Sequence, residues 1–280
     1  MKIIRMIYRY IEIDVDYFFS KGNLFKKLVT ISSVNFSAIF SLLKINIPAY
    51  IDGQFILSDK PLTIKTFLSG IYDFWFETRE TNIFNTKSPV IFDVGANVGQ
   101  FLIGVKNILP NAAVHSFEPD PKTFEYLTKN SARLKNVTIN NLALSEKDGF
   151  LEFYQSKVSS EWSSLVKPYT GDFNLIKVDS KKLDDYIASK SVVIIDLLKI
   201  DVEGAEMLVL KGGEKTLKIS KFILVEASID RSEDNMKSSD ILKFLFDKGF
   251  EIDSVGRIFR ERVGSSQSSV NIILRNKNLA

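Results

Sequence analysis

Short apolar runs alternate with stretches of helical periodicity from about residue 87 to the end of the sequence. Residues 90–94 form an apolar run that leads into a glycine, which is typical of a buried parallel strand. Residues 101–109 carry apolar side chains at helical spacing, and Pro110 ends that pattern. The predicted strands are residues 90–94, 113–117, 137–142, 149–154, 174–178, 192–202, 222–225 and 270–274, the last of them as an antiparallel edge strand.

Two further helices of this region have recognisable ends. Asp120 suits an N-cap and Pro121 the first helical position, while residues 240–247 are followed by Gly249 as a C-cap. Strands and helices that alternate at this spacing predict an α/β fold with a doubly wound, mostly parallel sheet. Helices then cover both faces of the sheet, and ligands bind beyond the carboxyl ends of its strands.

The first part of the chain has a different character. We expect residues 1–85 to form an N-terminal, mostly helical extension, with a helix over 1–19 and a buried aromatic element over 65–80, and residues 86–280 to form the main domain. The uncharged stretch 28–43 is shorter than the roughly 20 apolar residues that a membrane span needs. It therefore predicts a buried or membrane-surface helix, which makes the N-terminal region the candidate for peripheral membrane contact.

The composition narrows the function. The 280 residues include 45% hydrophobic and 25% charged residues, as in ordinary globular proteins, and the net charge of +3 gives no reason to expect nucleic-acid binding. No cysteine is present, which excludes a thiol nucleophile and a thiolate metal site and fits a cytoplasmic location. The one histidine, His115, lies inside a predicted strand, so we expect a structural role for it and assign no metal ligands.

Residues 93–99 form a glycine loop between a predicted strand and a predicted helix. The glycines let the backbone approach a ligand closely, and the helix start offers free N–H groups, which suits a dinucleotide or an adenosine cofactor. Asp93 stands where a dinucleotide fingerprint has its first glycine. A pyrophosphate at ~5 Å from that carboxylate would meet a repulsion of roughly 3 kcal/mol at an effective dielectric of about 20. The cationic methyl donor S-adenosylmethionine would be attracted instead.

Glu118 ends the second predicted strand, 19 residues after Gly99. A carboxylate at this position can accept hydrogen bonds from both ribose hydroxyls of a bound nucleoside. Taken alone, a glutamate at a strand end is equally compatible with a solvated surface residue. Its position after the glycine loop favours the binding role.

Residues 199–206 end the long strand that we expect beside the first strand. Asp201 and Glu203 leave this strand at the mouth of the predicted site. One interpretation is that they contact ligand. The other is that they cap the next helix, because carboxylates are stabilised at a helix N-terminus.

Four ordered motifs together resemble those of the FkbM family of S-adenosylmethionine-dependent methyltransferases. They are D-V-G-A-N-V-G from residue 93, F-E-P-D-P from 117, N-L-A-L-S from 141 and K-I-D-V-E-G-A-E from 199, and the resemblance covers roughly residues 88–228. It implies a seven-stranded class I methyltransferase sheet with strand order 3-2-1-4-5-7-6. It also implies a cofactor site for S-adenosyl-L-methionine formed by Asp93, Gly95, Ala96, Asn97, Gly99, Glu118, Pro119, Leu142, Ala143 and Asp201, with Glu118 on the ribose, Leu142 and Ala143 near the adenine and Ser145 close by.

The same resemblance implies methyl transfer to a hydroxyl of a small-molecule, sugar or glycan acceptor. A hydroxyl acceptor benefits from a general base, and Asp201 and Glu203 are the candidates for it. Two other readings stay open, a catalytically degenerate partner module and a nicotinamide-dependent oxidoreductase, although the missing G-x-G-x-x-G disfavours the second. Methylation of nitrogen or protein is a further alternative, mildly disfavoured because no N-P-P-Y-like motif follows the central strand.

Two aromatic regions keep two interpretations each. Trp162, with the serines around it, lies in an irregular stretch that is either a lid over the acceptor or a plain surface loop. Tyr72, Phe74, Trp75 and Phe76 either pack in the core or line a sugar site.

Overall fold

The computed structural model describes residues 24–42, 48–51, 54–58, 83–157, 160–167, 171–228, 238–260 and 268–279. The helix expected over residues 1–19 and the aromatic element expected over 65–80 lie outside these ranges.

A seven-stranded sheet forms the centre of the molecule, with the order β11-β12-β10-β9-β3-β4-β5. Read from β5 and numbered along the chain within this sheet, the order is 3-2-1-4-5-7-6, so the predicted class I arrangement is confirmed. Its strands are β3 (Val90–Val94), β4 (Ala113–Phe117), β5 (Val137–Asn140), β9 (Ile195–Ile200), β10 (Ser220–Ser228), β11 (Phe250–Arg260) and β12 (Ser268–Asn276). The strands β5, β4, β3, β9 and β10 are neighbours in this order and run parallel, so β3 lies between β4 and β9.

The antiparallel end of the sheet differs from the prediction. Strand β12 pairs antiparallel with β10, as expected. Strand β11 pairs with the other side of β12 and is therefore the edge strand of the sheet. The expectation that residues 270–274 form the edge is therefore wrong, and β11 was not predicted. Strand β11 escaped prediction because its apolar residues do not alternate regularly between the two faces of the sheet. Ile252 and Val255 are 44% and 59% exposed, and the pairing register with β12 shifts after each of them.

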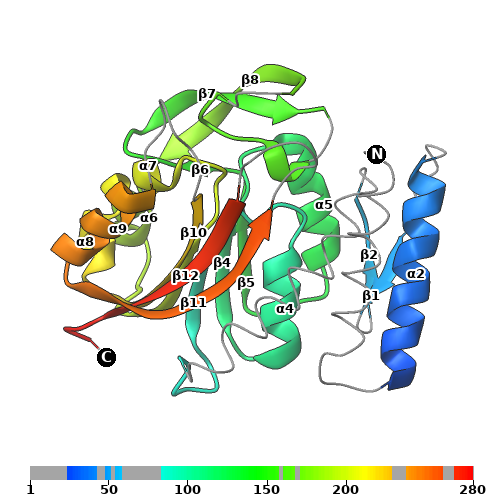
Figure 1. Cartoon of the computed structure of the whole chain (residues 1–280), viewed down its shortest axis with the longest axis horizontal. Helices are drawn as coiled ribbons and strands as arrows, with labels where there is room; N and C mark the ends of the chain where they lie inside the picture. The colour runs from blue at the N-terminus through cyan, green and yellow to red at the C-terminus, as the bar shows by residue number, and fades with distance from the viewer. Residues whose placement is uncertain are drawn as a thin grey trace.

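Helices cover both faces of the sheet (Figure 1). They are α4 (Gln100–Ile108), α5 (Pro121–Ser131), α6 (Leu183–Ala188), α7 (Glu206–Gly212), α8 (Glu214–Leu217) and α9 (Ser238–Asp247). Helices α4 and α5 lie on one face, and the other four lie on the opposite face. The predicted caps are present, because the Asp120 side chain accepts a hydrogen bond from the Lys122 N–H at 2.9 Å and Gly249 takes a φ of 90° after α9.

A second, three-stranded sheet lies apart from the first, at the top of Figure 1. It has the order β6-β8-β7, from β6 (Ala143–Leu144), β7 (Gly149–Ser156) and β8 (Phe173–Lys181). We call it the small sheet. A short 3-10 helix, η1 (Ser160–Trp162), follows β7, and we call residues 160–167 the β7–β8 connection.

The described part of the N-terminal region contains a helix and a hairpin. Helix α2 (Leu24–Leu42) packs on strand β1 (Ala49–Ile51), which pairs with β2 (Gln54–Ile56). Their apolar side chains form one cluster with Val98 and Ile103 of the main domain. The region expected to be mostly helical thus also contributes a β-hairpin, and it packs directly behind the glycine loop.

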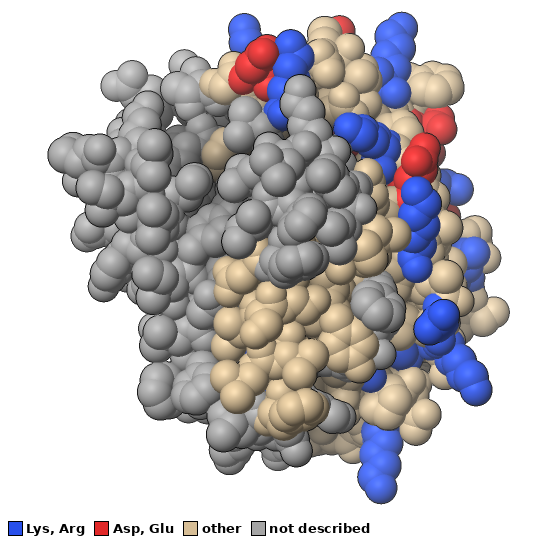
Figure 2. All heavy atoms as spheres, turned by 90° about the vertical axis from the view of Figure 1, so that its right-hand side faces the viewer, with Lys and Arg blue, Asp and Glu red and all other residues tan. Residues whose placement is uncertain are grey.

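Helix α2 keeps part of its surface uncovered. Phe25 and Leu28 are 74% and 48% exposed, while Val34 is fully buried. Figure 2 shows uncharged residues in the middle of this face, with lysine and arginine side chains and some acidic ones along its upper and right-hand edges. Among the described residues, no helix combines the length and apolarity that crossing a membrane requires.

Asn130 of α5 ties the N-terminal hairpin to the glycine loop. Its Oδ1 accepts from the Leu57 N–H at 2.9 Å, and its Nδ2 donates to the carbonyls of Leu57 and Val98 at 3.0 and 2.8 Å. The side chain is buried, so these backbone groups have no easy replacement by water.

We therefore expect Asn130→Ala to lower the free energy of unfolding by about 2–4 kcal/mol, because it leaves three hydrogen bonds of a buried side chain unmade. Urea unfolding followed by circular dichroism would measure this. The exposed Asn174 provides the control, since Asn174→Ala should change the same quantity by less than about 0.5 kcal/mol. Equal losses for the two variants would contradict the linking role of Asn130.

Candidate functional site

The loops that follow β3, β4 and β9 are joined by backbone hydrogen bonds. The N–H groups of Gly95 and Ala96 both donate to the carbonyl of Phe117, at 3.1 and 2.9 Å, and the Asp201 N–H donates to the Val94 carbonyl at 3.0 Å. The predicted motifs therefore meet at the carboxyl ends of three adjacent strands, where ligands bind in sheets of this kind.

Gly95 is required at its position by two separate constraints. Its φ is +83°, and a Cβ atom there would lie 1.8 Å from the carbonyl oxygen of Asp201. Asn97 also has a positive φ, of 50°, and Gly99 one of 102° just before α4 begins. The loop thus passes close to the end of β9 and turns its chain into the start of α4, the helix end that generally offers N–H groups to a ligand.

Glu118 lies directly against the glycine loop. Its Oε2 accepts from the Asn97 N–H and its Oε1 from the Asp120 N–H, both at 2.9 Å. Burial raises the pKa of the Glu118 carboxyl to about 8, although the two backbone N–H groups favour the ionised form. The structure therefore brings residues 93–99 and Glu118 together at the carboxyl ends of the strands, as the hypothesis that Glu118 binds the ribose requires.

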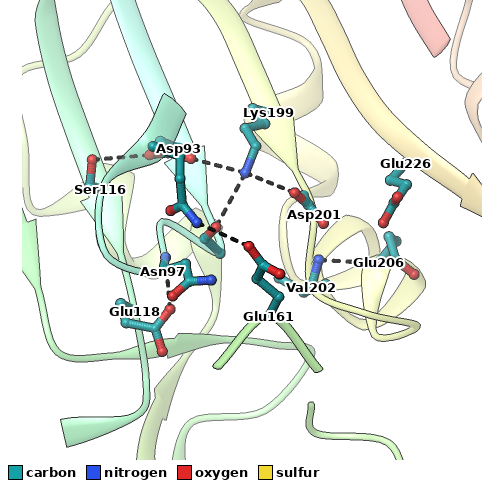
Figure 3. Close-up of polar contacts among 12 residues, drawn as sticks. Asp93, Asn97, Ser116, Glu118, Glu161, Lys199, Asp201, Val202, Glu206 and Glu226 are labelled. Atoms are coloured by element: carbon teal, nitrogen blue, oxygen red, sulfur yellow. Dashed lines mark hydrogen bonds and ion pairs between the residues drawn. The ribbon is translucent and has the colours of Figure 1, made fainter. Parts of the chain in front are cut away.

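Lys199 of β9 connects three groups beneath the loop (Figure 3). Its Nζ lies 3.2 Å from Asp93 Oδ1, 3.3 Å from Asp201 Oδ2 and 3.2 Å from the Gly95 carbonyl oxygen. Burial alone would lower the pKa of Lys199, but the carboxylates of Asp201 and Asp93 raise it above its ordinary value. The lysine therefore stays charged in a buried position.

Asp93 occupies a different position from the one that its predicted role suggests. Its carboxyl is completely buried, is paired with Lys199, and accepts from the Ser116 hydroxyl at 3.4 Å. Burial raises the pKa of this carboxyl, and the Lys199 ammonium opposes that rise. The negative charge that we expected to attract a cationic cofactor directly is thus largely balanced by Lys199.

Acidic side chains surround the end of β9. The Asp201 side chain is 40% exposed, and its carboxylate oxygens lie within 4.8 Å of those of Glu203 and Glu226. Glu203 has a φ of 56°, a left-handed conformation that is unusual for glutamate. Oxygens at this spacing also suit a divalent cation, although groups of exposed acids are common without one.

Helix α7 has no side-chain hydrogen bond at its N-cap, Ala205, so neither Asp201 nor Glu203 fills the capping role that the sequence left open, and Glu206 instead holds the turn before the helix. Its Oε1 accepts from the N–H groups of Val202 and Gly204, at 3.3 and 2.9 Å, and α7 begins at Glu206 itself. Asp201 and Glu203 are thereby left with side chains near the mouth rather than on the helix start.

The segment expected near an adenine follows the loop that carries Glu118. Asn141 Nδ2 donates to the carbonyls of Glu118 and Pro119, at 2.8 and 3.0 Å. Leu142 is half-buried, and Ala143 is buried at the start of the small sheet. These contacts bring Leu142 and Ala143 close to the loop that carries Glu118, at the carboxyl ends of the strands.

The β7–β8 connection contacts the loops from the outside. The Ser160 hydroxyl donates to Asn97 Oδ1 at 2.8 Å, Gln100 Nε2 donates to Glu161 Oε1 at 3.4 Å, and the Ser164 hydroxyl donates to the Glu203 carbonyl at 2.9 Å. Sequence reasoning noted this serine-rich stretch but identified neither Glu161 nor Lys199. The signal available for Lys199 was its position near the end of the central strand, as the first residue of the motif that carries Asp201.

His115 packs in the sheet, as its position in the predicted strand indicated. Its ring stacks on Phe92 at 4.7 Å between centroids, and its Nδ1 forms a 2.9 Å hydrogen bond with the Tyr186 hydroxyl. Burial lowers the pKa of His115, with the charge of Lys190 acting in the same direction.

A model of the Methyltransferase FkbM domain matches residues 93–252, which include the glycine loop, Glu118, Lys199 and Asp201. The chain belongs to the FkbM methyltransferase family. The family suggested by the four motifs is therefore confirmed.

Curated relatives of this FkbM family chain include three methyltransferases. The 2-O-methyltransferase NoeI of Sinorhizobium fredii is 30% identical over 154 residues, covering 50% of this chain and 63% of NoeI. The hexuronic acid methyltransferase AglP of Haloferax volcanii is 32% identical over 183 residues, covering 59% and 70%. The 31-O-demethyl-FK506 methyltransferase FkbM of Streptomyces tacrolimicus is 30% identical over 156 residues, covering 45% and 59%. The match thus spans less than two thirds of NoeI.

The close approach at Gly95 gives a testable prediction. Gly95→Ala combines a left-handed backbone with a backbone clash, so we expect it to lower the free energy of unfolding by at least about 2 kcal/mol. Gly149 has a φ of 111° but no atom within 4 Å of an added Cβ, so Gly149→Ala carries only the backbone cost, about 1 kcal/mol. Chemical unfolding of both variants would measure the difference, and equal effects would show that the Asp201 carbonyl does not restrict the loop.

Proposed function

We propose that the protein is an S-adenosylmethionine-dependent O-methyltransferase that acts on a hydroxyl of a small-molecule, sugar or glycan acceptor. The observation that carries this proposal is the contact between Glu118 and the glycine loop at the Asn97 N–H. A buried carboxylate beside the start of a helix suits the ribose and the amino-acid part of this cofactor. Family membership supports the same cofactor.

The chain's own residues supply binding and orientation. The proposed cofactor contacts are Asp93, Gly95, Ala96, Asn97, Gly99, Glu118, Pro119, Leu142, Ala143 and Asp201. Asp93 would act mainly through Lys199 and the loop backbone, because its carboxyl is buried beneath both. Glu118 would accept hydrogen bonds from the ribose hydroxyls with the lone pairs that its backbone partners leave free.

When bound, the cofactor supplies an electrophilic methyl group on sulfur. Asp201 and Glu203 are the proposed bases, and either carboxylate would take the proton of the acceptor hydroxyl as that oxygen forms its bond to the methyl carbon. The cofactor would supply the methyl group and keep the carbon–sulfur electron pair, and the carboxylate would pass the proton to solvent. The partial exposure of Asp201 gives an acceptor access to it.

The relatives support a hydroxyl or sugar acceptor. NoeI is named as a 2-O-methyltransferase, AglP as a hexuronic acid methyltransferase and FkbM as acting on 31-O-demethyl-FK506. A degenerate partner module is disfavoured, because Glu118 and Asp201 are both in place beside an intact glycine loop.

Ligand-dependent melting tests the cofactor. S-adenosylhomocysteine, the demethylated product, at about 100 times its dissociation constant should add about 2.7 kcal/mol of stability and raise the melting temperature. NAD at the same concentration should leave the melting temperature unchanged. A shift with NAD alone would refute the proposal, and a shift with neither ligand would favour the degenerate module.

The raised pKa of Glu118 predicts how binding depends on pH. The free carboxyl has a pKa of about 8 and is ionised when it accepts from the ribose, so binding releases a proton and strengthens as pH rises toward 8. Between about pH 7 and pH 8.5 the affinity for S-adenosylhomocysteine should rise about eightfold and then level off. Calorimetric titration would measure this. Glu118→Gln should bind more weakly and lose the pH dependence, and a Gln variant that keeps the same slope would remove Glu118 from the ribose role.

A further inference from the structure

One buried serine of the β7–β8 connection contacts residues 201–204, the turn after β9, which we call the β9 turn. The Ser164 hydroxyl donates to the Glu203 carbonyl at 2.9 Å and lies 3.3 Å from the Val202 carbonyl oxygen, so the two carbonyls share its single proton. Its oxygen accepts from the Val166 N–H at 3.0 Å. Ser164 is only 2% exposed, so water cannot easily replace these contacts.

The β9 turn holds Glu203 in an unusual backbone conformation. The φ of Glu203 is 56°, a left-handed value that is disfavoured for residues with a side chain. In extended backbone, successive carbonyl groups point in opposite directions, so one hydroxyl can reach the carbonyls of residues 202 and 203 only where the chain coils. The contacts of Ser164 therefore fit the left-handed form of Glu203 and not an extended one.

The peptide group that follows Glu203 is held from two sides. Ser164 binds its carbonyl, and Glu206 Oε1 accepts from its N–H, which is the N–H of Gly204, at 2.9 Å. Glu206 also accepts from the Val202 N–H, the contact that Figure 3 marks with a dashed line. Helix α7 thus holds the N–H groups of the β9 turn, while the β7–β8 connection holds its carbonyls.

Ser164 is itself fixed relative to the glycine loop. Its backbone exchanges two hydrogen bonds with Tyr154 of β7, at 2.8 and 3.1 Å. Near its other end, the connection reaches the glycine loop, where the Ser160 hydroxyl donates to Asn97 Oδ1 at 2.8 Å. The connection therefore sets the position of the β9 turn relative to the loop that we propose to bind the cofactor.

The β9 turn carries both proposed bases. Carboxylate oxygens of Asp201 and Glu203 lie within 4.8 Å of each other. Methyl transfer needs the acceptor oxygen, the methyl carbon and the sulfur in line, and a misplacement of about 1 Å can lower the rate about 100-fold. A residue that fixes the backbone of this turn therefore controls how well a base meets the acceptor hydroxyl.

We propose that Ser164 is a positioning residue for methyl transfer, which holds the β9 turn in place relative to the glycine loop. It acts through the backbone of Glu203 rather than by contact with the acceptor. This inference rests on the proposed function. It adds to it a hydroxyl that the rate of transfer requires and that cofactor binding does not.

The first test measures the coupling of Ser164 to Glu203 and needs no acceptor. Urea unfolding would be compared for the wild type, Ser164→Ala, Glu203→Gly and the double variant. Glycine adopts the left-handed conformation readily, so Glu203→Gly should favour folding about fivefold more in the wild type than beside Ser164→Ala, where the turn can relax. The comparison cancels the other contacts of the Glu203 side chain.

The neighbouring Ser163 provides the matched control. Its hydroxyl accepts from the Ser156 N–H at 3.0 Å, so it joins the connection to β7 and not to the β9 turn. The effects of Ser163→Ala and Glu203→Gly should therefore multiply, to within about twofold in the folding equilibrium. Independent effects of Ser164→Ala and Glu203→Gly would overturn the inference, because Ser164 would then not hold the conformation of Glu203.

The second test separates rate from binding. Methyl transfer from labelled S-adenosylmethionine would be followed with a panel of methyl hexosides and methyl hexuronides, and S-adenosylhomocysteine binding by calorimetry. Ser164→Ala should lower kcat about 10-fold to 100-fold and change the Kd for S-adenosylhomocysteine less than about twofold. Ser164→Cys, which keeps a weak donor, should give an intermediate kcat, and Ser163→Ala should leave both quantities unchanged.

An unchanged kcat in Ser164→Ala would mean that transfer does not need the serine, and an equal loss of cofactor affinity would mean a general disturbance of the site. Either result overturns the inference and leaves the cofactor proposal intact. Failure of the wild type to bind S-adenosylhomocysteine would instead overturn the proposed function. Failure to methylate any member of the panel would overturn its sugar acceptor, and the unfolding comparison would still decide whether Ser164 holds the β9 turn.

Discussion

The shared ion pair of Lys199 with Asp93 and Asp201 is the interaction on which the site depends. It places a charged ammonium beneath the glycine loop, where it also holds the Gly95 carbonyl at 3.2 Å. Removing one partner of a buried pair leaves an uncompensated charge and typically costs about 3–5 kcal/mol. The same lysine explains how β3 can carry a fully buried aspartate one residue before its end.

The sequence predicted the parts of the site that depend on local pattern. The glycine loop, Glu118 and Asp201 each follow an apolar run, and parallel strands bring their carboxyl ends together, so their proximity could be expected. The role of Lys199 could not, because it depends on the side-chain geometry between two strands that are about 100 residues apart in sequence. Glu161 escaped notice for a similar reason, since only the fold shows which irregular segment faces the loops.

The antiparallel edge of the sheet could not be predicted correctly from the pattern of apolar residues. Residues 272–274 are apolar on both faces, which is the signature of an interior strand, and β12 indeed lies between β10 and β11. β11 has bulges at two places, so its alternation is interrupted and no strand was predicted there. In the N-terminal region, apolar composition alone did not separate the β1–β2 hairpin from helix.

The position of β12 has a consequence for biosynthesis. The ribosome makes β11 before β12, yet β12 must lie between β10 and β11 in the finished sheet. While β12 is still in the exit tunnel, β10 has an unpaired edge and β11 has no neighbour in this sheet, so both expose backbone groups that invite pairing with other chains. The nascent protein therefore depends on a late insertion step, and chaperones that shield open strand edges would act during that interval.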